Sequence, residues 1–332
     1  APMDRLEAAL KTHPGLKRPK NEDAVGGEAT PWGGVYVVAD GMGGHRTGEV
    51  ASRLAVETVL ARLSREEPPS PKDLLEALEE ANGRIHREAQ RPENRGMGTT
   101  CTVLVLDLPY ALVAHVGDSR AYLLREGNLL QLTEDHSWAA ERVRQGLLSP
   151  EEARTHRWRN VITNALGSFP QARVDLLGLK LRPGDTFLLC TGGLSGVLEE
   201  RALKEVLAHF PPAEAAERLV ALANEWGGPD NVSVAVVRVP EALPERQRPY
   251  ASPWRPPRGN PSASRWGRCP RSSPPRSWSP PPRGGGWGGG TPSSFSSGWW
   301  WWPTSSSTPC GPPRPRRQGA GRLFAVWSGP SS

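Results

Sequence analysis

Apolar runs without polar alternation mark the central strands that we expect in this chain. They occupy residues 35–39 (VYVVA), 99–107 (TTCTVLVLD), 111–116, 185–190 and 232–239. Such runs are typical of strands that are covered on both faces. Two further short runs, 120–125 and 129–132, flank Glu126-Gly127-Asn128 and predict a hairpin.

Helical periodicity appears in several segments between these strands. It predicts helices over residues 49–63, 71–89, 200–209 and 213–226, and a short helical lead-in over residues 3–12. Residues 135–159 are polar and charged, with a helix start at Ser149-Pro150, and we expect them to lie outside the core. The predicted fold class is α+β, a β-sandwich of two antiparallel sheets flanked by helices.

Composition divides the 332 residues near position 240. Residues 1–240 carry a net charge of −5, whereas residues 241–332 hold 13 arginines, two acidic residues and nine of the 13 tryptophans. The basic balance of the whole chain is therefore a property of the tail, and it gives no reason to expect a nucleic-acid partner for the folded part. We predict a catalytic domain over 1–240. The Pro/Gly/Ser/Arg/Trp-rich tail over 241–332 is interpreted as disordered or as the product of a shifted reading frame, the alternative being a flexible basic arm.

Cysteine usage and hydropathy indicate a reducing compartment. Cys101 and Cys190 lie inside apolar runs, where buried structural thiols are expected rather than a disulfide or a metal site. No apolar stretch approaches the length of a membrane span, and the first residues lack the apolar core of a signal peptide. We therefore expect a cytoplasmic monomer.

Acidic residues recur at strand ends and in loops beside glycine. Asp40 follows the run 35–39 and precedes Gly41, while Asp118 and Asp230 occupy comparable places. A carboxylate at a strand end is held on a rigid support, and the glycine lets the backbone approach a ligand. An Asp-Gly pair taken alone is equally well explained as an ordinary turn.

The polar segment near the N-terminus adds Arg18, Glu22 and Asp23 to this set. Carboxylates and the carbonyl of Gly41, with no His or Cys cluster nearby, are hard oxygen ligands that suit Mg²⁺ or Mn²⁺ rather than zinc. Two such ions activate a water for in-line attack on phosphorus, and an arginine can clamp the phosphoryl oxygens. A solvated loop is the alternative interpretation of the segment.

Eight short motifs then appear in order along residues 12–239: RPKNEDA, VVADGMGGH, GTTCTVLVL, HVGDSRAYLL, LTEDHS, NVITNALG, LLCTGGLSGVL and GPDNVSVAVV. This series resembles the bacterial branch of the PPM-type (type 2C) metal-dependent serine/threonine protein phosphatases. The resemblance implies an α-β-β-α sandwich with the metals at one end. Phosphorylated proteins, the substrates of an opposing Ser/Thr kinase, would be the partners.

The resemblance also implies roles for individual residues. Arg18 would bind phosphate, Asp40 would bridge two core Mn²⁺ or Mg²⁺ ions, and Gly41 would offer its carbonyl to one of them. Glu22 and Asp23 would bind one ion, partly through water, and Asp230 the other, oriented by Asn231. Asp118 would hold a third, weaker ion. The segment 135–159 corresponds to the flap beside the active site.

Histidine and serine residues near these motifs are interpreted as structural. In animal members of the family a general-acid histidine directly follows the Asp-Gly pair, and this chain has Met42 there. His45 is therefore interpreted as a turn residue, and His115 and His136 as structural. Ser119 has no Ser-His-Asp arrangement around it, which favours simple hydroxyl packing.

One position departs from the family pattern. The family has a metal-binding aspartate where this chain reads Cys190-Thr191-Gly192-Gly193, so the ligand position is Gly192. Two functions follow: a Mn²⁺- or Mg²⁺-dependent phosphoserine/phosphothreonine phosphatase that is either impaired by Gly192 or tolerates it, or a non-catalytic phosphoprotein-binding pseudophosphatase. Thr191 or a shifted Asp118 is a possible partial replacement for the missing ligand.

Overall fold

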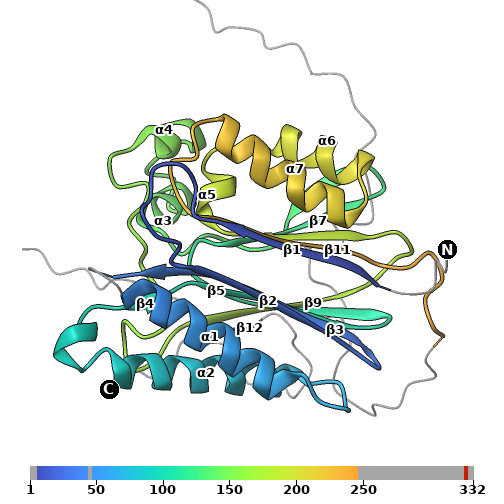
Figure 1. Ribbon diagram of the computed structural model, residues 1–332, viewed down its shortest axis with the longest axis horizontal. Helices are drawn as coiled ribbons and strands as arrows, with labels where there is room; N and C mark the ends of the chain where they lie inside the picture. The colour runs from blue at the N-terminus through green and yellow to red at the C-terminus, as the bar shows by residue number, and fades with distance from the viewer. Residues whose placement is uncertain (1–5, 44–46, 246–324, 328–332) are drawn as a thin grey trace, which may run out of the picture. The chain divides into compact units, whose positions relative to one another are not determined.

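The computed structural model describes residues 6–43, 47–245 and 325–327. His45 and most of the segment 241–332 lie outside these residues, so the division of the chain at residue 240 stays a prediction. Within the described residues, the strands and helices form two sheets with helices on the outside of each (Figure 1).

The strands are β1 (Glu7–His13), β2 (Asp23–Thr30), β3 (Gly33–Met42), β4 (Gly98–Thr99), β5 (Cys101–Asp107), β6 (Tyr110–Val116), β7 (Arg120–Arg125), β8 (Asn128–Gln131), β9 (Val174–Lys180), β10 (Thr186–Cys190), β11 (Val232–Arg238) and β12 (Ala325–Trp327). One sheet has the order β1-β11-β10-β7-β8. The other has the order β12-β9-β6-β5-β3-β2, with β4 beside β3. Every pairing is antiparallel. The predicted sandwich of two antiparallel sheets is therefore confirmed.

The helices are α1 (Thr47–Leu63), α2 (Pro71–Glu88), α3 (Trp138–Arg144), α4 (Pro150–Thr155), α5 (Gly192–Ser195), α6 (Glu200–His209) and α7 (Pro212–Glu225), with a 3-10 turn at Pro92–Asn94. Helices α1 and α2 cover the outer face of one sheet, and α5, α6 and α7 cover the other (Figure 1). The four long helices that periodicity predicts are confirmed to within two residues at each end. Helix α2 starts where Ser70 and Asp73 form a capping box, which satisfies free backbone N–H groups.

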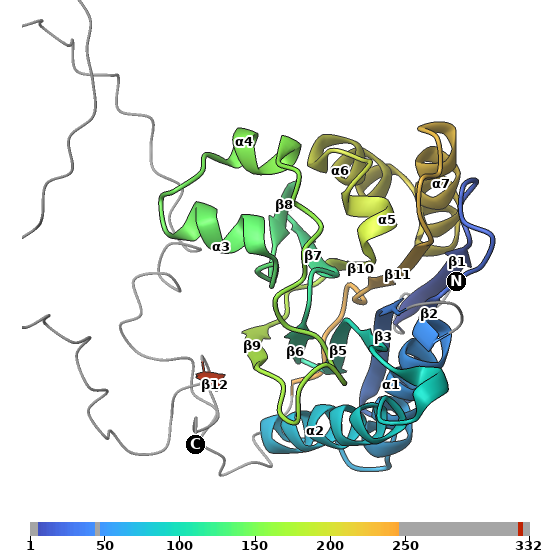
Figure 2. The ribbon, with the colours of Figure 1, turned by 90° about the vertical axis from the view of Figure 1, so that its left-hand side faces the viewer.

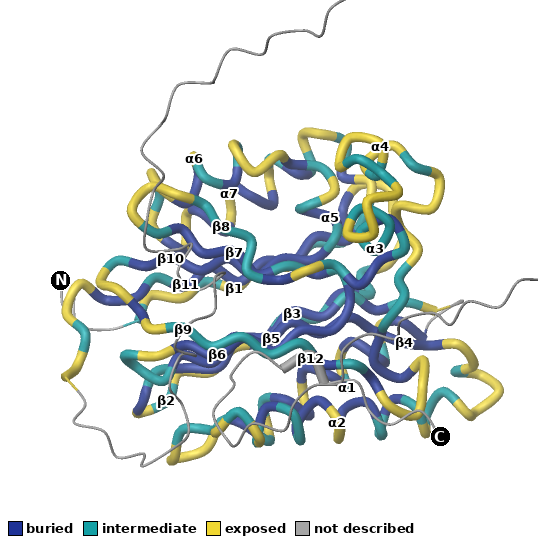
Figure 3. The backbone as a smooth tube through the Cα atoms, turned by 180° about the vertical axis from the view of Figure 1, so that it is seen from behind, coloured by how far each residue is buried: buried dark blue, intermediate teal, exposed yellow. Residues whose placement is uncertain are grey.

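Both faces of the central strands are buried, which explains why their sequences do not alternate. Successive side chains of a strand point to opposite faces. In β3, Val35, Val37 and Ala39 pack in the cluster below α1 and α2, whereas Tyr36 and Val38 pack between the sheets. Figure 3 shows the result: two buried layers of strands between partly exposed helices.

The predicted helix over residues 3–12 is wrong. Residues 7–13 form β1, an edge strand paired with β11 from Glu7–Arg238 to His13–Val232. Its outward side chains stay exposed, and Ala9 packs against the cluster under α7. Pairing with a buried neighbour strand outweighs the local helical preference of this short segment.

The predicted excursion lies outside the two sheets, as Figure 2 shows for α3 and α4. Its two ends are joined by an antiparallel bridge between Ser137 and Ile162. The Ser149 start is confirmed, because the hydroxyl and Glu152 form a capping box on α4. We call residues 135–162 the flap.

Cys101 and Cys190 are free and buried, as predicted.

His115 on β6 is buried and neutral. Its Nε2 lies 3.0 Å from the carbonyl oxygen of Glu134, and its Nδ1 lies 2.9 Å from the hydroxyl of Thr102. A carbonyl only accepts, so Nε2–H donates to Glu134 and Nδ1 accepts from Thr102. Burial, followed by the neighbouring His136, lowers the pKa of His115 to about 4.

We expect acid to weaken the fold through His115. Below pH ~6.5 the unfolded chain takes up a proton at this position, but the folded chain does not until pH falls to about 4. Stability present above pH ~6.5 is therefore lost across this window, by about 3 kcal/mol in total. Urea unfolding at a series of pH values measures this loss.

His115→Gln cannot be protonated, so the free energy of unfolding of this variant should depend less on pH than that of the wild type. All other titrating groups are common to the two proteins and cancel in the comparison. His209→Gln, at an exposed position of α6, is the matched control and should retain the wild-type slope. Equal slopes for wild type and His115→Gln would contradict the assignment.

Candidate active site

Asp40 lies near the end of β3, where the backbone is held from two sides. Its N–H donates to the Thr100 hydroxyl at 2.8 Å, and its carbonyl accepts from Thr100 N–H and the Thr99 hydroxyl, both at 3.0 Å. Thr99 belongs to β4, which pairs with the last two residues of β3. The position of the Asp40 carboxylate is therefore fixed by backbone contacts that do not involve the carboxylate itself.

Gly41 is required by close packing of three backbone segments. Its N–H donates to the Glu22 carbonyl at 3.1 Å. A Cβ at this position would lie 2.0 Å from the carbonyl oxygen of Gly48 on α1 and 2.5 Å from that of Glu22. Any side chain at position 41 would therefore push α1 and the Glu22 segment away from β3.

Asp23 joins the two sheets at this end of the sandwich. It pairs with Asp40 across β2 and β3, and its Oδ2 accepts from the hydroxyls of Thr191 at 2.7 Å and Ser233 at 2.8 Å. Its Oδ1 is buried without a hydrogen-bond partner among the described residues. Burial raises the pKa of Asp23 to about 7. This orphaned oxygen is a reason to expect a cation nearby.

The hydroxyl of Thr191 makes two hydrogen bonds within the protein. It donates to Asp23 and accepts from the N–H of Ser233 at 3.0 Å. Its hydrogen is thus committed to the Asp23 carboxylate, and Thr191 acts as a support for Asp23. Sequence reasoning missed the supporting roles of Thr191, Ser233 and Thr100, because uncharged hydroxyls at strand ends carry no distinctive pattern.

Arg18 lies over Asp230 in a two-point ion pair. Nε is 3.0 Å from Oδ1, and Nη2 is 3.0 Å from Oδ2. Both side chains are about half exposed, at 53% and 44%. The remaining N–H groups of the guanidinium are free to bind an anion from solution.

Asn231 stabilises the polar segment that precedes Asp23. Its Oδ1 accepts from the N–H of Glu22 at 2.8 Å, and its Nδ2 donates to the carbonyls of Pro14 and Lys20. Asn231 therefore holds Glu22 and the Arg18 segment against the loop before β11.

Asp118 lies in the loop between β6 and β7, which is fixed by two buried contacts. Gly117 has φ of +106°, and its N–H donates to Nδ1 of His136 at 3.1 Å. The N–H of His136 donates back to the Gly117 carbonyl at 2.7 Å. Ser119 bonds Thr100 at 2.6 Å, as expected for a packed hydroxyl. His136 is therefore structural, in agreement with its interpretation.

The carboxylates repel one another. Burial raises the pKa of Asp40 well above its usual range, and Asp23, Asp118 and Asp230 raise it further, whereas Arg18 opposes them. Burial and the charge of Asp135 raise the pKa of Asp118 to about 6. Burial also raises the pKa of Glu22. The site thus concentrates more negative charge than Arg18 alone compensates.

Gly192 opens α5 directly beside Asp40. A Cβ built at position 192 would lie 3.7 Å from Oδ2 of Asp40, in ordinary contact, and apart from the adjoining residues and the backbone of α5 no other heavy atom of the described residues lies within 4 Å. A Cβ is therefore accommodated here, beside the Asp40 carboxylate.

The donor chemistry fits a hard divalent cation. Carboxylates of Asp40, Asp118 and Asp230 and an unpaired oxygen of Asp23 are typical ligands for Mg²⁺ or Mn²⁺. Within the described residues, however, no three His, Cys, Asp or Glu side chains form a group close enough to hold an ion by themselves. Glycine at position 192 makes the set smaller by one carboxylate.

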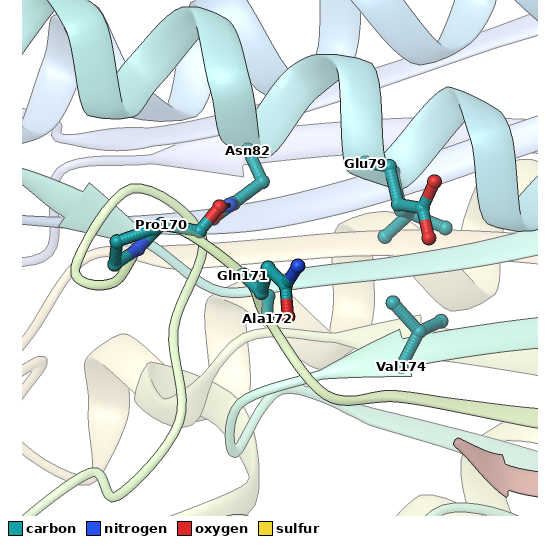
Figure 4. Close-up of a pocket in the computed structure, with 7 residues that line it drawn as sticks. Glu79, Asn82, Pro170, Gln171, Ala172 and Val174 are labelled. Carbon is teal, nitrogen blue, oxygen red and sulfur yellow. Dashed lines mark hydrogen bonds between the residues drawn. The ribbon is translucent and has the colours of Figure 1, made fainter. Parts of the chain in front are cut away.

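A separate hollow of about 240 Å³ lies beside α2 (Figure 4). Leu78, Glu79 and Asn82 line it from the helix, and Pro170, Gln171, Ala172 and Val174 close it from the other side. Its lining has none of the carboxylates described above.

None of the helices in the described part of the chain is long and apolar enough to cross a membrane.

Comparison with known proteins agrees with this arrangement. The family model of protein phosphatase 2C matches residues 17–225. The chain is 40% identical to the serine/threonine protein phosphatase PstP of Mycobacterium tuberculosis over 239 residues, which is 70% of this chain but only 45% of that relative. It therefore spans less than half of PstP.

A second relative is matched over nearly its whole length. The chain is 36% identical to the protein phosphatase PhpP of Streptococcus pneumoniae over 71% of this chain and 98% of the relative. A solved structure of the PstP catalytic domain in complex with two manganese ions has 37% identity and a TM-score of 0.64, covering 70% of this chain and 97% of that structure. The order of motifs, the two-sheet sandwich and these matches agree: the chain belongs to the protein phosphatase 2C family.

Proposed function

We propose that this protein hydrolyses phosphoserine and phosphothreonine in proteins at a centre of two Mn²⁺ or Mg²⁺ ions. The observation that carries the proposal is the uncompensated negative charge around Asp40, whose pKa is raised by burial and by Asp23, Asp118 and Asp230. The two manganese ions in the related PstP structure support it. When bound, such ions supply an activated water and neutralise charge on the phosphoryl group.

We assign the ligand roles as the family resemblance implies. Asp40 would bridge the two ions, and the Gly41 carbonyl would bind one of them. Glu22 and Asp23 would hold one ion and Asp230 the other, with Asn231 in support. Asp118 would hold a third, weaker ion.

Arg18 would bind the phosphoryl group of the substrate. Its pair with Asp230 uses Nε and Nη2 and holds the planar guanidinium in one orientation. The N–H groups that remain free can donate to two phosphoryl oxygens. Because the side chain is about half exposed, an incoming phosphoprotein can reach it.

Gly192 favours a second candidate function, a non-catalytic phosphoprotein-binding protein. The space beside Asp40 holds no carboxylate from position 192. Fewer anionic ligands weaken and displace a metal, and a displacement of ~1 Å can cost ~10²-fold in rate. Binding through Arg18 would survive this loss, whereas turnover would not.

The substrate proteins, an opposing Ser/Thr kinase and the location in the cytoplasm belong to the same proposal. The free, buried thiols of Cys101 and Cys190 agree with a reducing compartment.

Restoring the carboxylate at position 192 tests which function applies. We expect Gly192→Asp to raise Mn²⁺-dependent hydrolysis of a phosphothreonine peptide at least about tenfold, equivalent to ~1.4 kcal/mol of transition-state stabilisation. The physical reason is the new carboxylate facing Asp40 in a space that accommodates it. The measurement is kcat/KM at saturating Mn²⁺.

Gly83→Asp on α2 is the matched control, because it adds the same charge away from the site and should leave the rate unchanged. Equal values of kcat/KM for wild type and Gly192→Asp would show that the absence of a carboxylate at position 192 does not limit hydrolysis. Tight binding of the peptide without turnover in the wild type would favour the non-catalytic function.

Neutralising Asp40 should separate metal binding from folding. A carboxyl group whose pKa is raised in the folded state costs folding free energy at pH 8, where the unfolded chain holds it ionised, and an amide carries no such cost. With a chelator present, we expect Asp40→Asn to melt at a temperature about 2–4 °C higher than the wild type, the shift that ~1 kcal/mol produces in a domain of this size.

Added Mn²⁺ should raise the melting temperature of the wild type by mass action but not that of Asp40→Asn. Glu57→Gln, at an exposed position of α1, is the control and should keep the wild-type response. An equal Mn²⁺ response in Asp40→Asn would show that Asp40 does not bind the ion.

A further inference from the structure

The flap carries a cluster of stacked aromatic rings. The ring of Trp138 stacks on His156 with 4.6 Å between centroids, and Trp158 meets the Trp138 ring edge-on at 4.9 Å. The cluster joins α3 to the segment after α4, although both helices are short. Trp158 nevertheless remains 43% exposed, so the cluster ends at the surface rather than in a core.

Two arginines lie against these rings. The guanidinium carbon of Arg142 is 5.2 Å from the Trp138 centroid, and that of Arg157 is 4.6 Å from the Trp158 centroid. Among the described residues neither arginine forms an ion pair, and the Arg142 side chain donates a hydrogen bond to Gln145 at 2.8 Å. A ring contact covers the flat face of a guanidinium and leaves its edge N–H groups free for a carboxylate.

The charge of the flap is opposite to that of the rest of the folded part. The flap, residues 135–162, contains five arginines and four acidic residues, a net charge of +1, whereas the rest of residues 1–240 carries a net charge of −6. An acidic partner is therefore repelled by most of this surface and attracted to the flap. This contrast favours carboxylates as the occupant over an uncharged or basic segment.

An ion pair and hydrogen bonds connect the base of the flap to the loop that carries Asp118. Arg120, two residues after Asp118, makes a two-point pair with Asp135 at 2.9 and 2.7 Å. His136 and Gly117 exchange two hydrogen bonds, and Trp138 N–H donates to the Val161 carbonyl. The aromatic cluster thus starts directly after a segment attached to the candidate active site.

We propose that Trp138, Arg142, Arg157 and Trp158 bind a carboxylate-rich segment of the substrate protein close to its phosphorylated residue. This proposal rests on the proposed function and makes it more specific: the preferred substrates carry Asp or Glu beside the phosphoserine or phosphothreonine. The rings hold the two guanidiniums in place before binding, so less side-chain freedom is lost when the carboxylates arrive.

The test uses the full chain and two labelled phosphothreonine peptides that differ only at the flanking residues, Asp/Glu in one and Asn/Gln in the other. Binding is measured by fluorescence anisotropy with a chelator present, which stops metal-dependent hydrolysis. We expect the wild type to bind the acidic peptide about fivefold more tightly, as two exposed charge pairs allow. The double variant Arg142→Gln/Arg157→Gln should reduce this ratio to about one.

Arg218→Gln is the matched control. Arg218 also stacks on a ring, with 3.8 Å to the Phe210 centroid, but it lies on α7. This variant should keep the wild-type ratio. The Arg-rich tail is common to all the proteins compared and cancels. The variant Arg142→Lys/Arg157→Lys keeps the charges without the planar fork and should give an intermediate ratio, and near-UV circular dichroism checks that the rings remain stacked.

A ratio in the double variant equal to that of the wild type overturns the proposal, as does the absence of any preference in the wild type. A preference for a second phosphate with none for carboxylates also overturns it. Hydrolysis of both peptides at equal kcat/KM with Mn²⁺ would uphold the phosphatase function and refute the flap proposal. Preferential binding without hydrolysis, lost in the double variant, would uphold the flap proposal and refute the phosphatase function.

Discussion

Repulsion among carboxylates at one end of the two sheets is the constraint on which the site depends. Asp40 cannot ionise easily beside Asp23, Asp118 and Asp230, and burial increases the cost. Such a group persists only where the surrounding backbone leaves it no alternative position. Thr99 of β4 and Thr100, which lies between β4 and β5, provide this restraint, because they form hydrogen bonds with the N–H and the carbonyl of Asp40 and leave its carboxylate free.

The contact between the two sheets determines what faces Asp40. Asp23 belongs to one sheet, and the hydroxyls of Thr191 and Ser233 that hold it come from the end of β10 and from β11 in the other. This link brings the start of α5, and with it Gly192, next to the Asp40 carboxylate. Compared with an aspartate, glycine at this position reduces the repulsion among the carboxylates, which favours the stability of the metal-free protein. It also removes one anionic ligand, which lowers the affinity for metal.

The flap is coupled to the site by hydrogen bonds at its base rather than by packing on the sheets. His136 donates from Nε2 to Asp175 on β9 at 2.8 Å, and its Nδ1 accepts from Asn164 and from Gly117. One buried ring at the start of the flap therefore connects the segment that follows the flap, strand β9 and the loop of Asp118. A substrate segment bound on the flap would act on the same loop that carries a candidate metal ligand.

The sequence alone determined the family, the buried strands, the long helices and the residue types of the site. Continuous apolar runs identify strands covered on both faces. The ordered motifs identify the acidic residues and the glycine at position 192, where the family has an aspartate. It did not determine the edge strand β1, because the half-buried positions of this strand hold Ala9, Lys11 and His13, which show no apolar alternation. It also did not indicate β2 or β9.

Only the tertiary structure decided which groups support the acids and how strongly the acids interact. Thr191, Ser233 and Thr100 are far apart in sequence from the carboxylates that they orient, and a hydroxyl has no charge or periodicity to mark it. The pKa of Asp40 likewise depends on charged neighbours from three separate segments. Sequence patterns record local preferences, whereas like-charge repulsion depends on distances that the packing of the two sheets sets.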